Sequence, residues 1–144
     1  MFMGTYYNSI DSKNRMIVPS KHRDRLGGRC VITKGIDSCL YIYSVSEWEK
    51  KVMKFSKLPE SDIYVREAMR RFFADAVECE FDKQGRIVIP QELINYAEIN
   101  KELITMGVMD KIEIWAKEIR DAQLNKENEL SSQDLSEALA KYDF

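Results

Sequence analysis

Apolar and polar residues alternate along residues 5–10 and again along residues 76–81. In the second stretch Val77, Cys79 and Phe81 share one side, and the residues between them lie on the other. Because successive side chains of a strand point to opposite faces, both stretches are predicted to be strands with one buried face. Each is followed by a short polar turn, three apolar residues and a proline.

The turn and the apolar run form an internal repeat. Residues 11–19 (DSKNRMIVP) and 82–90 (DKQGRIVIP) both open with aspartate, place arginine four positions later and end in proline. Asn14 and Gly85 occupy the same position, and both residue types tolerate a positive φ. The pattern predicts a left-handed residue there and a turn that closes a hairpin, with the arginine at its mouth.

The apolar runs, residues 16–18 and 87–89, contain no polar position and are therefore predicted to be strands covered on both faces. Past each proline the repeat continues with one short helix and two strands, and the second copy has a single inserted residue before these strands. The helices are expected at 20–26 and 91–97, and the strands at 29–33, 40–43, 103–105 and 112–115.

Helical patterns fill the segment between the two copies and recur near the C-terminus. Ser44 or Ser46, each with glutamate three positions later, fits the start of one helix. Pro59 separates it from a second helix that begins at Asp62, and residues 132–142 are expected to form a last, weak helix. Two copies of one pattern predict a duplicated fold with a pseudo-two-fold axis.

Length and cysteine content are typical of a single intracellular domain. A chain of 144 residues buries a core of normal size without help from disulfides. Cys30, Cys39 and Cys79 are odd in number and lack the spacing of zinc or redox motifs, so they are predicted to be reduced and buried or half-buried. No basic leader and no apolar run of membrane length is apparent, which predicts a cytoplasmic protein.

The net charge of −2 conceals an asymmetry along the chain. Residues 11–34 carry seven Lys or Arg against two Asp, whereas residues 117–144 carry four bases against seven acids. A basic face beside an acidic tail limits non-specific contact with polyanions. Solvated surface charge explains the same pattern, and the sequence leaves both interpretations open.

An enzymatic function has little support in the sequence. The chain has one histidine, His22, and a single histidine within a basic helix is typical of a surface residue. The signatures of phosphate-binding loops, nucleophile elbows and zinc helices are absent. An arginine stays protonated near neutral pH, so the repeated Asp and Arg are not an acid–base pair. The sequence predicts no catalytic residue, no metal and no cofactor.

The repeated Asp and Arg are better suited to binding. Arginine presents a planar fork of donors that matches guanine O6 and N7 or a phosphate, and a nearby carboxylate holds that fork in one orientation. Asp11 with Arg15, and Asp82 with Arg86, have the spacing for this arrangement. The alternative is that each Asp caps its turn and pairs with its own Arg to fix the hairpin, without any ligand.

A combination of four stretches marks the chain more specifically than either motif alone. These stretches are residues 1–4 (MFMG), 10–15 (IDSKNR) with Pro19, 71–90 and 112–115 (IEIW). In this order they resemble the MraZ family of bacterial transcriptional regulators.

The resemblance covers about residues 1–116. It implies a mixed α/β fold, a double-split β-barrel of two AbrB-like swapped-hairpin halves with pseudo-two-fold symmetry and peripheral helices. It also implies a homo-oligomer assembled as a ring, and binding to direct repeats in the promoter of its own division and cell-wall gene cluster, in the cytoplasm at the nucleoid. The residues it places in the DNA-facing motifs are Asp11, Lys13, Arg15, Asp82, Lys83 and Arg86.

Three positions depart from the family pattern. Asn14 stands where the first motif usually has glycine, and asparagine is the next best residue for a left-handed position. His22 replaces an aromatic residue after the first proline, which implies looser packing or a contact that responds to pH. Arg120 stands where the repeat, judged from Trp48, places an aromatic residue, so the second long helix is expected to be shorter or packed differently.

The sequence thus predicts a non-enzymatic, DNA-binding regulator built as one compact domain. Its parts are expected at 1–60 (first half with the following helix), 61–120 (second half with the preceding helix) and 121–144 (a polar, acidic tail). Two alternatives stay open. One is an oligomeric scaffold whose hairpins make only subunit contacts, and the other is a small-molecule enzyme with a pocket lined by the four Asp and Arg residues.

Overall fold

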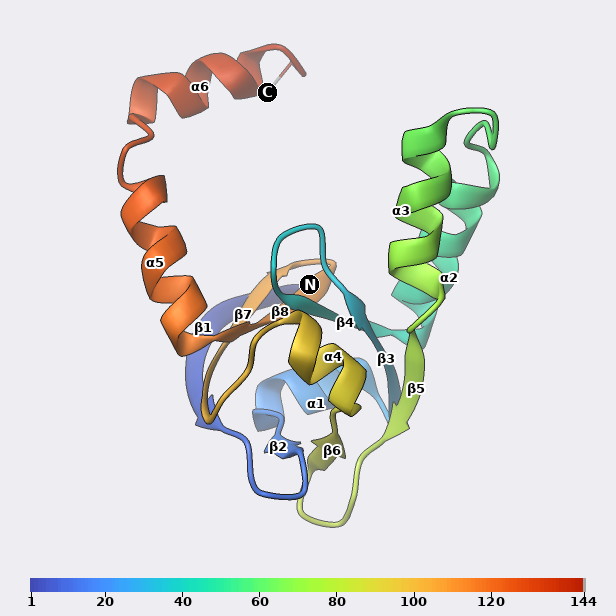
Figure 1. Cartoon of the computed structure of the whole chain (residues 1–144), viewed down its shortest axis with the longest axis vertical. Coiled ribbons are helices and arrows are strands. Elements are labelled where there is room, and N and C mark those ends of the chain that lie inside the picture. The colour runs from blue at the N-terminus through green and yellow to red at the C-terminus, as the bar shows by residue number, and fades with distance from the viewer. Residues whose placement is uncertain (144) are drawn as a thin grey trace.

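The computed structural model describes residues 1–143, which form eight strands and six helices (Figure 1). Each element of the first repeat has a counterpart in the second, in the same order. The first repeat contains β1 (Phe2–Ser9), β2 (Arg15–Ile17), α1 (Ser20–Leu26), β3 (Arg29–Lys34), β4 (Leu40–Ser44), α2 (Val45–Ser56) and α3 (Ile63–Phe73). The second contains β5 (Val77–Glu80), β6 (Arg86–Val88), α4 (Gln91–Tyr96), β7 (Glu102–Met109), β8 (Lys111–Ala116), α5 (Lys117–Glu127) and α6 (Ser132–Ala140).

Six strands form one antiparallel sheet in the order β1-β7-β8-β4-β3-β5. The strands of the two repeats correspond to one another, β1 to β5, β3 to β7 and β4 to β8. When each strand is replaced by its counterpart, the strand order reads the same from either edge of the sheet. The predicted pseudo-two-fold axis therefore passes between β8 and β4. The first strand of each repeat pairs with a strand of the other repeat, β1 with β7 and β5 with β3.

The remaining two strands, β2 and β6, form a separate two-stranded antiparallel ribbon across the repeats. The predicted hairpin is thus only partly formed. The turn at residues 11–14 closes, and Ile10 bridges to Met16, but β1 and β2 then leave in different directions and pair with different partners. Hairpin prediction from sequence assumes that strands joined by a short turn also pair, and here the tertiary exchange overrides it.

The ribbon is covered on one face only, which corrects the prediction for its apolar runs. Met16 and Ile87, which face each other in the ribbon, are each 1% exposed and pack with the inner side chains of the large sheet. Ile17 and Val88 were predicted to be covered as well, but they are 53% and 56% exposed. They are open because no element among residues 1–143 packs on the outer side of the ribbon.

Local signals place the helices as predicted. Ser44 caps α2 by accepting a hydrogen bond from the Glu47 N–H (3.2 Å), and Asp62 caps α3 through the Tyr64 N–H (2.8 Å). The two helices pack against one face of the sheet through an aromatic cluster, formed by Tyr41, Tyr43, Trp48, Phe55, Phe72, Phe73 and Trp115.

The second long helix, α5, is nearly as long as α2 but packs differently. The sequence predicted a difference because Arg120 stands where Trp48 lies in the first repeat. In the first repeat the ring of Trp48 packs at a tilt against that of Tyr43, with ring centroids 5.7 Å apart. At the equivalent positions the Arg120 guanidinium lies 5.5 Å from the ring of Trp115 and pairs with Glu127 at 2.8 Å. A cation–π contact thus replaces an aromatic pair. Helix α6 stands away from the sheet (Figure 1).

His22 is not the surface residue that its basic neighbours indicated. It is 2% exposed, lies between the rings of Phe2 and Tyr6 at 5.8 and 5.1 Å, and its Nε2 has no hydrogen-bond partner among residues 1–143. Burial, and secondarily the charge of Arg25, hold its pKa below the usual value. His22 therefore packs in the core as an aromatic residue would. The charged residues next to it in the sequence gave no sign of this burial.

The cysteines are free, as predicted. Cys30 and Cys39 are buried and Cys79 is half-buried. Burial raises the pKa of the Cys30 thiol to about 12 and that of Cys79 to about 11, so the thiols are protonated at neutral pH.

The fold is mixed α/β with a mostly antiparallel sheet. The sheet edges β1 and β5 do not pair with each other within residues 1–143, so the sheet is open, and the more specific double-split barrel remains a prediction. The domain limits near 60 and 120 also remain a prediction, and Phe144, the end of the predicted tail, lies outside the described residues. No helix in the described part of the chain is long and apolar enough to cross a membrane.

Candidate nucleic-acid interface

The first turn is built around the carboxylate of Asp11. Its Oδ1 accepts hydrogen bonds from the backbone N–H groups of Lys13 and Arg15, both at 2.9 Å. Its Oδ2 accepts a hydrogen bond from Nε of Arg15 at 2.7 Å. Asn14 has a φ of 59°, the left-handed conformation that the sequence predicted. One oxygen therefore shapes the turn, and the other orients the arginine.

The second turn repeats this geometry around Asp82. Oδ1 accepts from the N–H groups of Gln84 and Arg86 at 2.9 Å, and Oδ2 accepts from Nε of Arg86 at 2.7 Å. Gly85 takes the left-handed position with a φ of 75°. Two turns of different sequence thus hold their arginines in the same way.

These hydrogen bonds keep both carboxylates ionised. The backbone N–H of Arg15 is the main cause that lowers the pKa of Asp11, and its side chain adds to the effect. The N–H and side chain of Arg86 do the same for the pKa of Asp82. Because these ion pairs are solvent-accessible, they contribute little to stability. Their clearest effect is to fix the direction of the two guanidinium groups.

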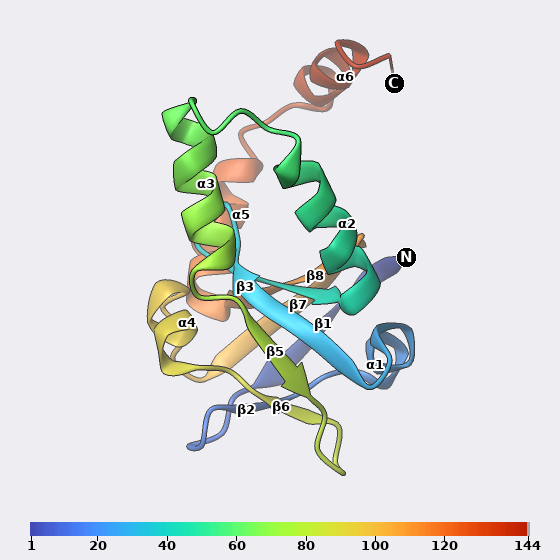
Figure 2. The same cartoon turned by 90° about the vertical axis from the view of Figure 1, so that its right-hand side faces the viewer.

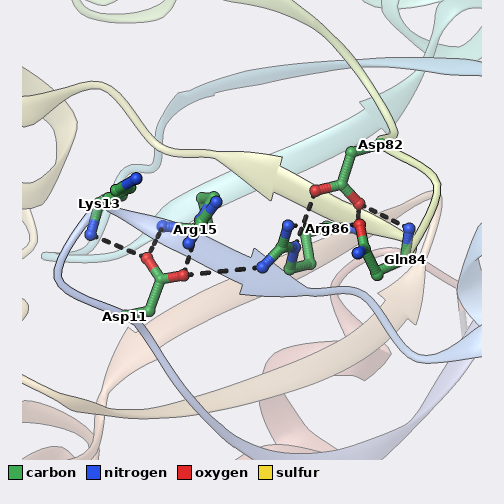
Figure 3. A network of polar contacts seen from close by, with 6 residues as sticks. All are labelled: Asp11, Lys13, Arg15, Asp82, Gln84 and Arg86. Carbon is green, nitrogen blue, oxygen red and sulfur yellow. Dashed lines mark hydrogen bonds and ion pairs between the residues drawn. The ribbon is translucent and has the colours of Figure 1, made fainter.

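The two turns lie at opposite ends of the short antiparallel ribbon that joins the repeats (Figure 3). Backbone hydrogen bonds fix each turn to the other repeat: the Val18 N–H donates to the Gly85 carbonyl at 3.1 Å, and the Ile89 N–H donates to the Asn14 carbonyl at 2.8 Å. Arg86 lies between the two carboxylates, with Nη1 4.0 Å from Oδ2 of Asp11. The site is therefore one surface formed by both repeats.

Arg23 reaches this surface at a place that the sequence did not indicate. In the structure its side chain covers the backbone of Gly85, so closely that a Cβ atom at Gly85 would lie 1.5 Å from Nη1 of Arg23. Because β2 pairs with β6, helix α1 of the first repeat lies beside the turn of the second repeat. The sequence alone could not predict this contact, because it did not show that β2 and β6 pair.

The surface lies at one end of the molecule, opposite helices α2, α3, α5 and α6 (Figure 2). Lys13 and Lys83 are exposed in the two turns, and Arg15 and Arg86 are the first residues of the two ribbon strands. The two motifs together contribute four basic and two acidic side chains, and Arg23 lies beside them, so this end of the molecule is basic. It projects from the body of the protein.

Other sites are not prominent. A hollow of about 690 Å³ lies between β1 and α1 and is lined by residues such as Tyr6, His22 and Arg25. None of the four Asp and Arg residues of the motifs lines it. Within residues 1–143 no group of His, Cys, Asp and Glu has the arrangement of a metal site.

Comparison with known proteins agrees with the internal repeat. The family model of the MraZ protein, whose description also reads antitoxin-like, matches the chain twice, at residues 1–71 and 72–143. The chain belongs to the MraZ family. The double match confirms that it contains two copies of one unit.

Curated relatives cover most or all of the chain. The transcriptional regulator MraZ of Clostridium acetobutylicum is 50% identical over 118 residues, 82% of this chain and 83% of the relative. The proteins of the same name from Pediococcus pentosaceus and Caldanaerobacter subterraneus subsp. tengcongensis are 45% and 44% identical over 142 residues, 99% of each chain.

Proposed function

We propose that this chain is a sequence-specific DNA-binding transcription regulator that reads DNA with the β2–β6 ribbon and its two turns. The observation that carries the proposal is the pair of identically oriented arginines on a projecting basic surface. Each Asp holds Nε of its Arg and so fixes the orientation of the guanidinium group. Nη2 of Arg86 also donates to Oε1 of Gln84 at 3.3 Å, a contact that DNA would have to compete with. Relatives named as transcriptional regulators over the full length support it.

A two-stranded ribbon fits the major groove of B-DNA, and the free end of a guanidinium matches O6 and N7 of guanine. In this arrangement Arg15 and Arg86 contact bases, while Asp11 and Asp82 orient them. Lys13 and Lys83 contact phosphates, and Arg23 adds a phosphate contact beside the second turn. Each bidentate arginine contributes about 1–3 kcal/mol of discrimination between bases.

Two motifs read few base pairs, so specificity requires repetition. We propose a ring of identical subunits on an operator of direct repeats, with neighbouring copies about 10 base pairs apart, one turn of DNA. Exposed apolar surfaces support self-assembly. The α2–α3 pair has a nearly apolar hollow of about 480 Å³ lined by Val52, Phe55 and Met69, and Leu135 and Leu139 of α6 are exposed.

The remaining parts of the proposal follow the family resemblance. The operator lies in the promoter of the chain's own division and cell-wall gene cluster, and the protein acts in the cytoplasm at the nucleoid. The two halves belong to a double-split barrel of AbrB-like units, for which the exchange of β1, β2, β5 and β6 between repeats is the supporting observation. The protein is not an enzyme, in line with the names of its relatives.

The test is a gel shift with the DNA upstream of the chain's own gene, at two salt concentrations, beside light scattering. Tight, salt-sensitive binding by an oligomer is expected. An assembly that forms independently of salt and has no affinity for DNA would instead identify a scaffold. A monomer at concentrations where DNA binds tightly would contradict the ring.

A further inference from the structure

The outer face of the β2–β6 ribbon carries two apolar side chains between its arginines. In the antiparallel register Arg15 lies opposite Val88, Met16 opposite Ile87, and Ile17 opposite Arg86. Since directly opposed residues point to the same side of a ribbon, and neighbours along a strand to opposite sides, the pair in the middle is buried. The outer face therefore consists of two arginines and two branched apolar residues, each arginine facing an apolar partner.

The fold leaves these two positions open, but it does not explain why both carry apolar side chains. Ile17 is 53% exposed and Val88 56%, although each lies directly opposite a charged arginine, Ile17 opposite Arg86 and Val88 opposite Arg15. A single exposed apolar residue is ordinary. Here the same position of both repeats carries a β-branched apolar side chain beside an oriented arginine. This pairing of charge and apolar surface indicates a ligand with both features at the same spacing.

The edges of the bases in the major groove have both features. Guanine offers O6 and N7 to arginine, and the C5-methyl group of thymine is the apolar group in that groove. Opposed Cβ atoms of a ribbon are about 4.5–5.5 Å apart, and successive base pairs are about 3.4 Å apart along the helix axis. A residue opposite an arginine thus lies over a base pair adjacent to the guanine that the arginine contacts.

We propose that Ile17 and Val88 recognise thymine by packing on its methyl group, Ile17 beside the guanine bound by Arg86 and Val88 beside the guanine bound by Arg15. This inference rests on the DNA binding proposed above and adds a second base to what each motif reads. A second copy of the chain is a poorer occupant for this face. If it docked through the same face, it would bring two further arginines against Arg15 and Arg86, and like charges repel at close range.

The experiment removes the methyl groups without changing base pairing or charge. Duplexes of the DNA upstream of the chain's own gene are prepared with thymine or with uracil, which differs from thymine only in lacking the methyl group. Wild-type protein should bind the uracil duplex about fourfold more weakly for each thymine methyl group that an apolar side chain covers. Ile17→Ser and Val88→Ser should bind the thymine duplex more weakly, and the double variant should no longer distinguish the two duplexes.

Val108→Ser is the matched control, because Val108 is an exposed valine on β7, in the other sheet. It should keep the full preference for thymine. Thermal melting and light scattering accompany each variant. Equal binding of both duplexes by wild type, with Arg15→Ala still abolishing specific binding, would overturn the inference and leave the proposed function intact. Absence of binding to either duplex would overturn the proposed function itself. A changed oligomeric mass in the serine variants, with the thymine preference retained, would assign the two residues to a subunit contact.

Discussion

The guanidinium of Arg23, on the first repeat's α1, covers the backbone of Gly85 in the second repeat's turn. Glycine is therefore favoured at position 85 for two reasons. Its φ of 75° is unfavourable for residues with a Cβ, and the space that a Cβ would occupy holds Arg23. At the equivalent position of the first repeat, the amide of Asn14 donates to Gln91 at 3.1 Å.

This relationship separates two effects of substitution. Gly85→Ala should reduce stability by about 1–2 kcal/mol because of the left-handed backbone, whereas Gly85→Asn should reduce it less, because asparagine adopts this conformation more readily. Both should displace Arg23 and lower the slope of DNA affinity against salt by about one unit, as Arg23→Ala should. Melting temperature and gel shifts at several salt concentrations measure the two effects. Asn14→Gly is the control, and a salt slope that changes as much there would argue against a role for Arg23.

Base reading by arginine predicts a specific pattern of weakened binding. Arg15→Ala and Arg86→Ala should each weaken operator binding by about 5- to 150-fold per subunit contact, the equivalent of about 1–3 kcal/mol, with unchanged fold and oligomer. Arg15→Lys should not restore binding, because lysine lacks the planar fork. Gel shifts beside size-exclusion chromatography and melting test this. Operator affinity equal to wild type in Arg15→Ala would show that the Asp–Arg motif is structural.

The lysines should behave differently from the arginines. Lys13→Ala and Lys83→Ala remove phosphate contacts, so each should weaken all DNA sequences alike and reduce the salt slope by about one unit. Competition between the operator and unrelated DNA at several salt concentrations separates this from base reading. An effect confined to the operator would assign the lysines to bases. A flat salt response of the wild type would contradict electrostatic binding altogether.

Buried His22 predicts a decrease in stability in mild acid. Its pKa is lowered in the folded protein from 6.5, so below pH 6.5 the unfolded chain binds the proton more strongly than the folded one. Stability should be unaffected by this group above pH 6.5 and should fall as pH decreases toward the folded pKa, by at most about 1.4 kcal/mol per pH unit.

Denaturant titrations from about pH 7.5 to about pH 5, on wild type and His22→Phe, measure this effect. The phenylalanine fits the aromatic surroundings of Phe2 and Tyr6 and should remove the pH dependence in this window. Titration of Asp11 and Asp82 lies at lower pH, because their pKa values are also lowered. Parallel curves for the two proteins would show that His22 does not titrate on unfolding.

Local chemistry made much of this molecule predictable from its sequence. Asparagine or glycine at the fourth turn position, aspartate at the first and proline at the end of the run each act over a few residues, and the structure confirms the left-handed Asn14 and Gly85 and helix α1 at Ser20–Leu26. The duplication was visible because nearly the same offset between equivalent positions recurs along the chain. The oriented Asp–Arg pairs of the site follow from the same local spacing.

What the sequence did not reveal depends on pairing between the repeats. The open face at Ile17 and Val88 and the position of Arg23 over Gly85 both result from the way the two halves cross. The burial of His22 depends instead on the packing of α1 against Phe2 and Tyr6 of β1. A run of three apolar residues is compatible with a strand buried on one face or on both, and only the partner strand decides.

The exchange of strands between repeats has a consequence for how the chain folds and how it arose. Strand β2 finds its partner β6 only after the long segment between Ile17 and Arg86 has been placed, so the ribbon closes late, and long-range pairing of this kind slows folding. In a single repeat β2 would have no partner strand. The equivalent strand of a second copy would complete the ribbon. The single chain thus has the geometry of a homodimer whose two subunits were joined end to end. Such a fusion makes the pairing of the two halves intramolecular, so that it no longer depends on protein concentration.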